Sequence, residues 1–253
     1  MEAALRRLEG GAAVALSGGV DSTLLLHLAR RHVPGRVAAF HLVTSLQPAT
    51  ERRWAAVVAQ RLGAELHFLH LDPLSVADVR ANGPRRCYHC KRLLYGAVRE
   101  QAAAAGLAHV LDGSNADDLD DDRPGLAALA ELGVLHPLAE AGMGKGEIRR
   151  LAREAGLPGW NRPAQSCLAT RIQVGQPLAP ERMTLVERGE GVLRRFGVAP
   201  VRLRWGPAGF TLQVPPDYHP RLRDPALWGL LRRALEAAGV APVDLDPRPR
   251  PSP

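Results

Sequence analysis

The stretch Ser17-Gly18-Gly19-Val20-Asp21-Ser22 decides the fold of this 253-residue chain. A short apolar run, residues 12–16, comes directly before it, and a segment with the apolar periodicity of a helix, residues 23–31, follows it. A strand, a glycine turn and a helix in this order predict the first unit of a parallel sheet. Gly18 and Gly19 let backbone amides approach a phosphate closely, and the helix directs its positive end at the same point.

The polar side chains of this stretch also favour a phosphate site. Ser17 and Ser22 supply hydroxyl donors for phosphate oxygens. Asp21 would repel an anion, so we expect it to hold Mg²⁺, which neutralises the phosphates. A tight turn in which Ser17 or Asp21 is an ordinary helix cap is the plainer alternative. Six residues in this order between a strand and a helix favour the phosphate site.

Strands and helices alternate outward from this point. The expected strands lie at residues 36–43, 65–71 and 108–111, and the expected helices at residues 49–62, 92–105, 126–132 and 145–155. Such alternation predicts an α/β fold with a doubly wound parallel sheet, whose ligands bind over the carboxyl ends of the strands.

A proline-rich stretch, residues 158–163, interrupts this pattern, and we expect a domain boundary between residues 158 and 176. Residues 1–170 are assigned to the nucleotide-binding domain, and residues 171–245 to a small α+β domain for substrate binding or oligomerisation. The expected elements of the second domain are helices at 180–196 and 225–238 and strands at 201–205 and 210–214. The tail, residues 246–253, is almost entirely Pro and Arg and is expected to be disordered.

Composition narrows the class of protein. Apolar residues make up 46% of the chain in short runs, and none of these runs approaches the roughly 20 residues that span a bilayer. The first residues lack the apolar core of an export signal, so we expect a cytoplasmic protein with no membrane partner. The net charge of +7 comes almost wholly from arginines spread along the chain, with lysine only at Lys91 and Lys145. This pattern indicates compositional bias, and no nucleic-acid partner is expected.

The three cysteines form a second group of candidate functional residues. Cys87 and Cys90 lie in a CxxC pattern and Cys167 lies near the expected domain boundary. Structural disulfides are not expected in a reducing compartment. Three thiolates suit an iron-sulfur cluster or zinc, but zinc needs a fourth ligand, and His89 is awkwardly placed between two others. A Cys167 that is only a small buried hydrophobe is another alternative.

Two further groups carry charge. Residues 112–122 follow a strand and are rich in acids, and with Asn115 they are candidates to contact ribose, Mg²⁺ or an adenylate; Asp120, Asp121 and Asp122 fit a solvated charge run equally well. Arg202 and Arg204 alternate on an expected strand, so both project to one face and could clamp a phosphate. A plain exposed strand face is the alternative.

The loop at 17–22 matches the SGGxDS signature of the adenine-nucleotide alpha hydrolases, or PP-loop superfamily, whose members cleave ATP between the alpha and beta phosphates. The stretches 86–91, 112–118, 123–126 and 166–172 resemble the LarE family of ATP-dependent sulfur transferases. This resemblance extends from Val14 to about Val214.

The resemblance implies a reaction and its cofactors. ATP and Mg²⁺ would convert a carboxylate of pyridinium-3,5-biscarboxylic acid mononucleotide to an acyl adenylate, which sulfur attacks to give a thiocarboxylate for the nickel-pincer nucleotide cofactor of lactate racemase. Some family members sacrifice the sulfur of the cysteine that corresponds to Cys167. Others have three cysteines, which would hold a [4Fe-4S] cluster that takes sulfide from an outside source, and we favour the cluster here.

The same resemblance implies roles for further residues. Asp117 and Asp118 match family positions at the nucleotide site, and Glu190 resembles an acidic residue near the phosphate and metal site. A homo-oligomer is implied as well. The second strand of the C-terminal domain departs from the family pattern Ala-Arg-Ile-Glu-Val, since residues 210–214 read Phe-Thr-Leu-Gln-Val, and a closing Gly-Tyr-Arg-x-Gly-Ser segment is missing. Asp217 is a candidate for the lost carboxylate.

Two other functions are compatible with these motifs. A tRNA thiolase of the same superfamily also combines a pyrophosphate loop with three cysteines. A non-catalytic nucleotide-binding module, in which ATP only sets the conformation, would use the loop and not the cysteines.

Overall fold

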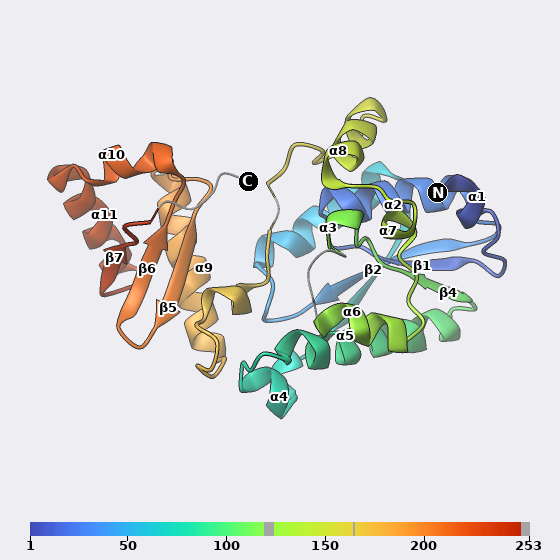
Figure 1. Ribbon diagram of the computed structural model, residues 1–253, viewed down its shortest axis with the longest axis horizontal. Coiled ribbons are helices and arrows are strands. Elements are labelled where there is room, and N and C mark those ends of the chain that lie inside the picture. The colour runs from blue at the N-terminus through green and yellow to red at the C-terminus, as the bar shows by residue number, and fades with distance from the viewer. Residues whose placement is uncertain (119–123, 164, 249–253) are drawn as a thin grey trace. The chain divides into compact units, whose positions relative to one another are not determined.

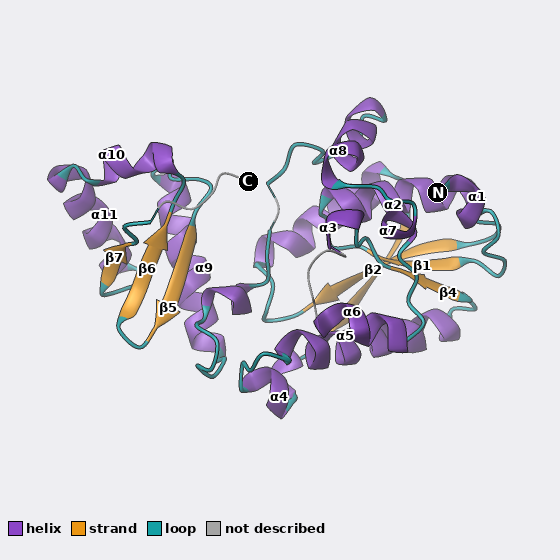
Figure 2. Cartoon of the chain, viewed as in Figure 1, coloured by secondary structure: helices purple, strands orange, loops and turns teal. Residues whose placement is uncertain are grey.

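A computed structural model of the chain describes residues 1–118, 124–163 and 165–248, which form two compact units (Figures 1 and 2). Unit 1 comprises Met1–Thr44, Ala49–Val79 and Arg85–Gln165, and unit 2 comprises Ser45–Pro48, Arg80–Pro84 and Ser166–Pro253. Hydrogen bonds attach the two short segments to unit 2: Leu168 N donates to the Leu46 carbonyl at 2.8 Å, and Asn82 Nδ2 donates to the Gln173 carbonyl at 2.9 Å.

Unit 1 contains a four-stranded sheet in the order β3-β2-β1-β4, in which every neighbouring pair is parallel. The strands are β1 (Ala12–Ala15), β2 (Val37–Val43), β3 (Glu65–His70) and β4 (His109–Leu111). β1 is central, and its Ala12 pairs with Val37 on one side and with His109 on the other. The carboxyl end of β1 leads directly into the loop at 17–22, as predicted.

Helices cover both faces of this sheet (Figure 2). One face, which carries Val14 and Leu16, packs against α2 (Val20–His32), α3 (Ala49–Arg61) and α8 (Lys145–Glu154). The other face, which carries Ala13 and Ala15, packs against α5 (Arg86–Ala104) and α6 (Pro124–Glu131). Since successive residues of a strand point to opposite faces, the apolar run of β1 is buried on both sides. The predicted doubly wound α/β fold is confirmed.

The differences from the predicted elements are local. α5 begins at Arg86 and not at residue 92, so the CxxC pattern lies inside the helix. Short elements were not predicted, because a single turn leaves no periodic pattern. Within residues 1–163 they are α1 (Glu2–Leu5), η1 (Pro73–Ser75), α4 (Ala77–Arg80), η2 (Ala116–Asp118) and α7 (Pro137–Glu140).

Unit 2 has a three-stranded sheet in the order β5-β6-β7, with helices that include α9 and α11, so a small α+β domain follows the parallel sheet as predicted. β5 and β6 are antiparallel, and β6 and β7 are parallel. The elements are η3 (Leu168–Arg171), α9 (Pro180–Arg195), β5 (Arg202–Gly206), β6 (Gly209–Gln213), η4 (Pro216–Tyr218), α10 (His219–Leu222), α11 (Pro225–Ala237) and β7 (Val243–Leu245). Leu203 and Leu212, from paired strands, are fully buried in this unit.

The end of the chain differs in part from the expected tail. β7 was not predicted, and the residue after it, Asp246, is buried and accepts a hydrogen bond from Gln213 Nε2 at 2.8 Å. Residues 249–253 of the expected disordered tail lie outside the described residues. Among the helices that the structure describes, none has the length and apolar character needed to cross a membrane.

Candidate active site

The glycines at the end of β1 are needed for the backbone path of the loop. Gly18 has a φ of +84°, in the left-handed region that favours glycine. A methyl group placed on Gly18 would lie only 2.9 Å from Cδ1 of Trp54. Gly113, which follows β4, approaches the same helix start, since a methyl group there would lie 2.9 Å from the Ser22 amide nitrogen. Any larger residue would push the loop away from this position.

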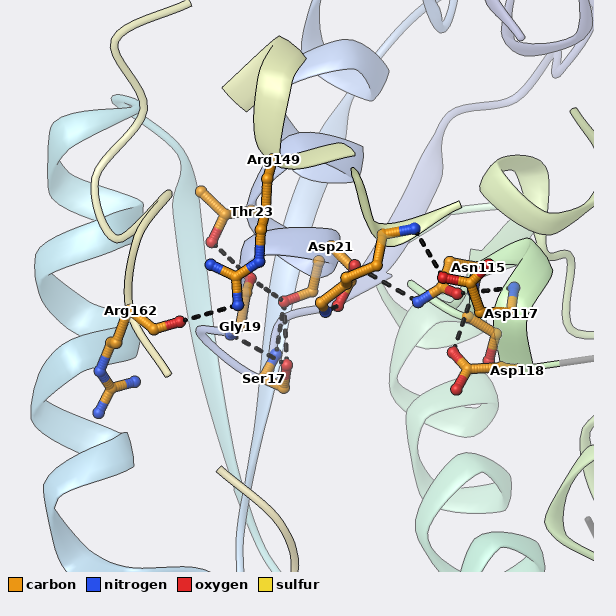
Figure 3. A network of polar contacts seen from close by, with 12 residues as sticks. Ser17, Gly19, Asp21, Thr23, Asn115, Asp117, Asp118, Arg149 and Arg162 are labelled. Carbon is orange, nitrogen blue, oxygen red and sulfur yellow. Dashed lines mark hydrogen bonds and ion pairs between the residues drawn. The ribbon is translucent and has the colours of Figure 1, made fainter. Parts of the chain in front are cut away.

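The two serines of the loop hold its backbone in place (Figure 3). Ser22 Oγ donates to the Gly19 carbonyl at 3.2 Å and accepts from the Ser17 amide at 3.2 Å. The two hydroxyl oxygens are 3.0 Å apart. Because the single proton of Ser22 is directed to Gly19, Ser17 is the donor in that pair. Thr23 Oγ1 also donates to the Gly19 carbonyl, at 2.9 Å. Much of the support for the loop therefore comes from residues within it and directly after it.

The start of α2 is suited to bind an anion. Gly19 is the N-cap residue, and among the described residues it provides no side-chain cap to the amides of the first turn. The helix has 13 residues, and its aligned peptide dipoles place partial positive charge at this end. Amides without a side-chain cap and a positive dipole end together form a phosphate-binding arrangement.

Asp21, in the first turn of α2, lies in a polar cluster that brings three further predicted residues together (Figure 3). Lys145 Nζ donates to Asp21 Oδ2, and Asn115 Nδ2 lies 3.5 Å from Asp21 Oδ1. The backbone amide of Lys145 donates to Asp117 Oδ2 at 2.8 Å. Asp117 thus accepts a hydrogen bond at the start of α8, although its own position is in the η2 turn after β4.

The η2 turn is stabilised by the side chains that were predicted to contact the nucleotide. The Asp117 amide donates to Asn115 Oδ1 at 3.0 Å, and the Asn115 amide donates to Asp118 Oδ2 at 3.1 Å. Asn115 itself is buried. These three residues therefore lie beside Asp21 in unit 1, whereas the neighbouring acids at positions 120–122 lie outside the described residues.

Lys145 was not predicted as a site residue. It lies in the same cluster as the loop although 124 positions separate it from Asp21 in the sequence. One feature that could have indicated it is its type, because lysine occurs only at Lys91 and Lys145 in a chain otherwise rich in arginine. A compact ammonium group can approach phosphate oxygens as a point charge, which a planar guanidinium does not do.

A buried carboxylate, Asp112, connects the end of β4 with α5. Tyr95 on α5 donates its hydroxyl to Asp112 Oδ2, and the Ser114 amide donates to Oδ1 at 2.9 Å. His136 Nδ1 lies 3.4 Å from Oδ1. Burial alone would raise the pKa of Asp112, but His136, the charge of Lys91, and the hydroxyls of Ser114 and Tyr95 outweigh it and hold that pKa well below its usual range.

The pKa of Tyr95, which donates to Asp112, shifts in the opposite direction. Burial, and then the negative charge of Asp112, raise the pKa of the Tyr95 hydroxyl, so it remains a donor at neutral pH. Lys91 and Tyr95 belong to the helix that begins at the CxxC pattern. Asp112 therefore joins α5 to the end of β4. The loop after β4 contains Gly113, which approaches the start of α2.

A second support for the loop comes from Trp54 on α3. Its Nε1 donates to the Gly18 carbonyl at 2.9 Å. The guanidinium carbon of Arg162 lies 5.1 Å from the centroid of the Trp54 ring, and Arg162 also forms two bonds to the carboxylate of Glu51, at 2.8 and 2.6 Å. A methyl group on Gly159 would lie 2.7 Å from Trp54 Cζ2. The proline-rich stretch at 158–163 thus holds Trp54 against the loop.

The three cysteines belong to different units. Cys87 is exposed and Cys90 is half-buried, and both lie on the same face of α5 because they are three residues apart. Cys167 is half-buried in unit 2, where it directly precedes η3 and its carbonyl accepts from Thr170 Oγ1 at 2.7 Å.

His89, which lies between Cys87 and Cys90 in the sequence, has its Nδ1 3.7 Å from Asp78 Oδ2. Over residues 1–118, 124–163 and 165–248, three or more His, Cys, Asp or Glu side chains nowhere gather to hold a metal ion.

Glu190 lies in unit 2, and both of its oxygens accept hydrogen bonds. Arg171 Nε donates to Oε1 at 2.9 Å, the Leu203 amide donates to Oε1 at 3.2 Å, and Arg194 donates to Oε2 at 3.3 Å. Arg171 and Glu190 are each only 3% exposed. Arg171 also donates to the carbonyl of Ser166 at 2.9 Å, so this ion pair holds the backbone next to Cys167.

Arg204 on β5 contacts β6, the strand whose sequence departs from the family pattern. Its Nε donates to Gln213 Oε1 at 2.6 Å, and its Nη1 donates to the Thr170 carbonyl at 2.8 Å. Gln213 in turn donates to Asp246, whose pKa is lowered first by this bond and then by the Arg248 amide. Asp217 is exposed on η4. The carboxylate connected with Gln213 is thus Asp246, from the expected tail, and not Asp217.

Comparison with known proteins gives one family match and three informative relatives. Residues 3–119 match the asparagine synthase family. The chain is 34% identical over 236 residues to pyridinium-3,5-bisthiocarboxylic acid mononucleotide synthase of Lactiplantibacillus plantarum, covering 92% of this chain and 84% of that protein. It is 34% identical over 235 residues to an uncharacterized protein of Synechocystis sp., covering 93% and 88%. Similarity to cytoplasmic tRNA 2-thiolation protein 1 of Bos taurus, 32% over 169 residues, covers 60% of this chain and 44% of that protein.

Proposed function

Because the chain belongs to the LarE family of ATP-dependent sulfur transferases, within the PP-loop superfamily, we propose that it thiolates both carboxylates of pyridinium-3,5-biscarboxylic acid mononucleotide. The product would serve the synthesis of a nickel-pincer nucleotide. The observation that carries this proposal is the extent of the similarity to the mononucleotide synthase. That similarity covers 92% of this chain and so includes most of both units. The similarity to the tRNA thiolation protein covers less of the chain. This shorter coverage disfavours the tRNA thiolase alternative.

The first step of the reaction would be adenylylation at the loop. A substrate carboxylate oxygen attacks the alpha phosphorus of ATP, the bond to the bridging oxygen breaks, and pyrophosphate leaves with its electrons. The start of α2, the Gly18–Gly19 backbone and Lys145 are arranged to attract the phosphates. Mg²⁺ at Asp21 would add the charge neutralisation that phosphoryl transfer needs, with Asn115, Asp117 and Asp118 as neighbours.

The second step would be attack by sulfur on the acyl carbon. A sulfide adds to the carbonyl, the bond to the adenylate oxygen breaks, and AMP leaves with the electron pair. Adenylylation is required because an ionised carboxylate is a poor electrophile. The sulfur nucleophile therefore has to reach the same carbon that the loop has activated.

The sulfur supply is proposed to involve Cys87, Cys90 and Cys167. Two of these thiols lie on one helix face, which suits ligands to a shared group, and thiolates are the preferred ligands of iron-sulfur clusters. A [4Fe-4S] cluster, when bound by three cysteines, would supply an open iron site for exogenous sulfide. The sacrificial route, in which Cys167 gives up its own sulfur and becomes dehydroalanine, is the competing proposal.

One experiment tests the reaction and separates these routes. Protein reconstituted with iron and sulfide is incubated with ATP, Mg²⁺, sulfide and the biscarboxylate mononucleotide, and both product and protein are weighed by mass spectrometry. We expect a product that has gained sulfur and a protein of unchanged mass. A protein lighter by about 34 Da would establish sacrifice of the cysteine. AMP released without the mononucleotide, or a mononucleotide that gains no sulfur, would contradict the proposed function.

Unit 2 is proposed to bind the phosphate of the substrate, with residues 171–245 acting as the substrate domain. Arg202 and Arg204 lie on β5 and point to one face of the strand by alternation. Glu190 is proposed as the acidic residue near that site, although its oxygens already bind Arg171, Arg194 and the Leu203 amide. We therefore expect Glu190 to act by positioning Arg171 and β5. The Gln213–Asp246 pair would replace the carboxylate that the family carries on β6.

A further inference from the structure

A basic depression lies on unit 1, apart from the loop. Its volume is about 730 Å³, and it is lined by the last turns of α2, by α3 and by the segment after α8. His27, Arg30 and Arg31 come from the end of α2 that is opposite to Asp21. With a rise of 1.5 Å per residue, Arg30 is roughly 14 Å from Asp21 along the helix axis. The depression is therefore a different site from the phosphate-binding start of that helix.

Its lining carries cations without matching anions. Arg30, Arg31 and Arg61 all line it, and none of the described lining residues is acidic. In the described part of the chain, no carboxylate pairs with any of these three guanidinium groups. The pKa of His27 responds to this charge, since burial and then Arg31, His32 and Arg30 lower it. Uncompensated positive charge in a concave site attracts an anion.

The shape and the apolar part of the lining indicate what kind of anion fits. Arginine forms paired hydrogen bonds with phosphate oxygens. The Trp54 ring, Val57 and Leu62 supply an apolar wall beside the arginines, and an aromatic ring can stack with a nucleobase. The volume is within the usual range for small-molecule sites. A methyl group on Gly63 would lie 3.6 Å from Arg30 Nη1, so this guanidinium reaches across to the end of α3.

We propose that this depression is a second nucleotide site, which binds a nucleoside monophosphate with its phosphate on Arg30 and Arg61 and its base toward Trp54. Trp54 also donates to the Gly18 carbonyl, so a ligand there contacts the side chain that supports the pyrophosphate loop. The site needs no metal and no covalent chemistry. It is independent of which substrate the loop activates.

Equilibrium dialysis with labelled AMP tests the proposal. The wild-type chain is compared with Arg30→Ala/Arg61→Ala, and with the control Arg7→Ala/Arg99→Ala, which removes the same charge from exposed positions outside the lining. We expect the Arg30→Ala/Arg61→Ala variant to bind one AMP fewer per chain than the wild type, because each lost guanidinium weakens phosphate binding about tenfold or more. The control is expected to match the wild type.

The difference between the proteins, and not the absolute number of bound AMP molecules, decides the outcome. If the loop bound no AMP, the wild type would bind one and the Arg30→Ala/Arg61→Ala variant none, so the test does not depend on the proposed function. Thermal unfolding checks that the variants are folded, and Arg30→Lys/Arg61→Lys provides a milder change that keeps the charge. Equal AMP binding by wild type and variant would overturn the proposal. So would arginine-dependent binding of a short RNA without any arginine-dependent binding of AMP.

Discussion

The pyrophosphate loop of unit 1 and the Arg171–Glu190 pair of unit 2 position polar groups in opposite ways. Apart from the Trp54 bond to Gly18, the hydrogen bonds that hold the loop backbone come from hydroxyls and amides that lie within six positions of one another, between Ser17 and Thr23. The ion pair joins η3 to α9 and is almost completely buried. A local device can leave backbone amides available to a ligand, whereas a buried pair uses nearly all of its bonding capacity for the fold. We therefore expect changes in the first to affect activity and changes in the second to affect stability.

Removing one partner of the buried pair gives the largest expected effect. Arg171→Met leaves the Glu190 carboxylate buried with fewer donors, and the free energy of unfolding should fall by about 3 to 5 kcal/mol. Urea unfolding measures this loss. The control Glu236→Gln, at an exposed position of α11, should change it by less than about 0.5 kcal/mol. A loss below about 1 kcal/mol in Arg171→Met would show that the buried pair does not serve mainly to stabilise the fold.

The loop gives the next largest effect, on activity. Gly18→Ala forces a side chain into the left-handed region and against Trp54, so the loop must shift. A displacement on the order of 1 Å can reduce the rate about 100-fold. The rate of substrate-dependent AMP release measures it. Gly146→Ala, on α8 with no neighbour close to the added methyl group, is the matched control and should retain the wild-type rate.

Lys145 is far from the loop in the sequence but contacts its Asp21. Lys145→Ala removes the ammonium that contacts Asp21, so the KM for ATP should rise about tenfold, with little change in the free energy of unfolding. Steady-state kinetics with ATP as the varied substrate measure the change. Arg150→Ala removes an exposed cation from the same helix and should leave the KM unchanged. Equal changes in the KM for ATP in the two variants would show that Lys145 has no specific role at the ATP site.

The smallest effect concerns pH and His41, on β2. His41 is buried and its Nδ1 donates to the Leu16 carbonyl at 2.7 Å, next to the loop. Burial lowers its pKa, while the bond to Leu16 opposes this. The unfolded chain therefore binds the proton more readily, and stability falls as the pH drops below the ordinary histidine range near 6.5.

His41→Asn keeps a donor for the Leu16 carbonyl and removes the titration. We expect the free energy of unfolding of this variant to decline less steeply between pH 7 and 5.5 than that of the wild type. One proton limits the difference in slope to about 1.4 kcal/mol per pH unit. Urea unfolding at several pH values measures both proteins. If the free energies of unfolding of both proteins declined in parallel, the titration of His41 would not contribute to the pH dependence of stability.

The sequence allowed the fold and the local part of the site to be predicted, because both depend on short patterns. The loop, the alternation of strands and helices and the acidic η2 turn are contiguous stretches. Lys145 and the Arg162–Glu51 pair were missed because their partners lie 124 and 111 positions away. β7 was missed because three residues before a proline-rich end carry no periodicity, and Asp246 was consequently assigned to a tail.

The most direct test of the central account separates the two halves of the reaction. ATP–pyrophosphate exchange is measured with the biscarboxylate mononucleotide in the wild type and in Cys167→Ala, together with formation of the thiocarboxylate. We predict that exchange depends on the mononucleotide and persists in Cys167→Ala, whereas thiocarboxylate formation is lost in that variant. Exchange that does not require the mononucleotide, or a Cys167→Ala variant that still makes the thiocarboxylate, would contradict the account.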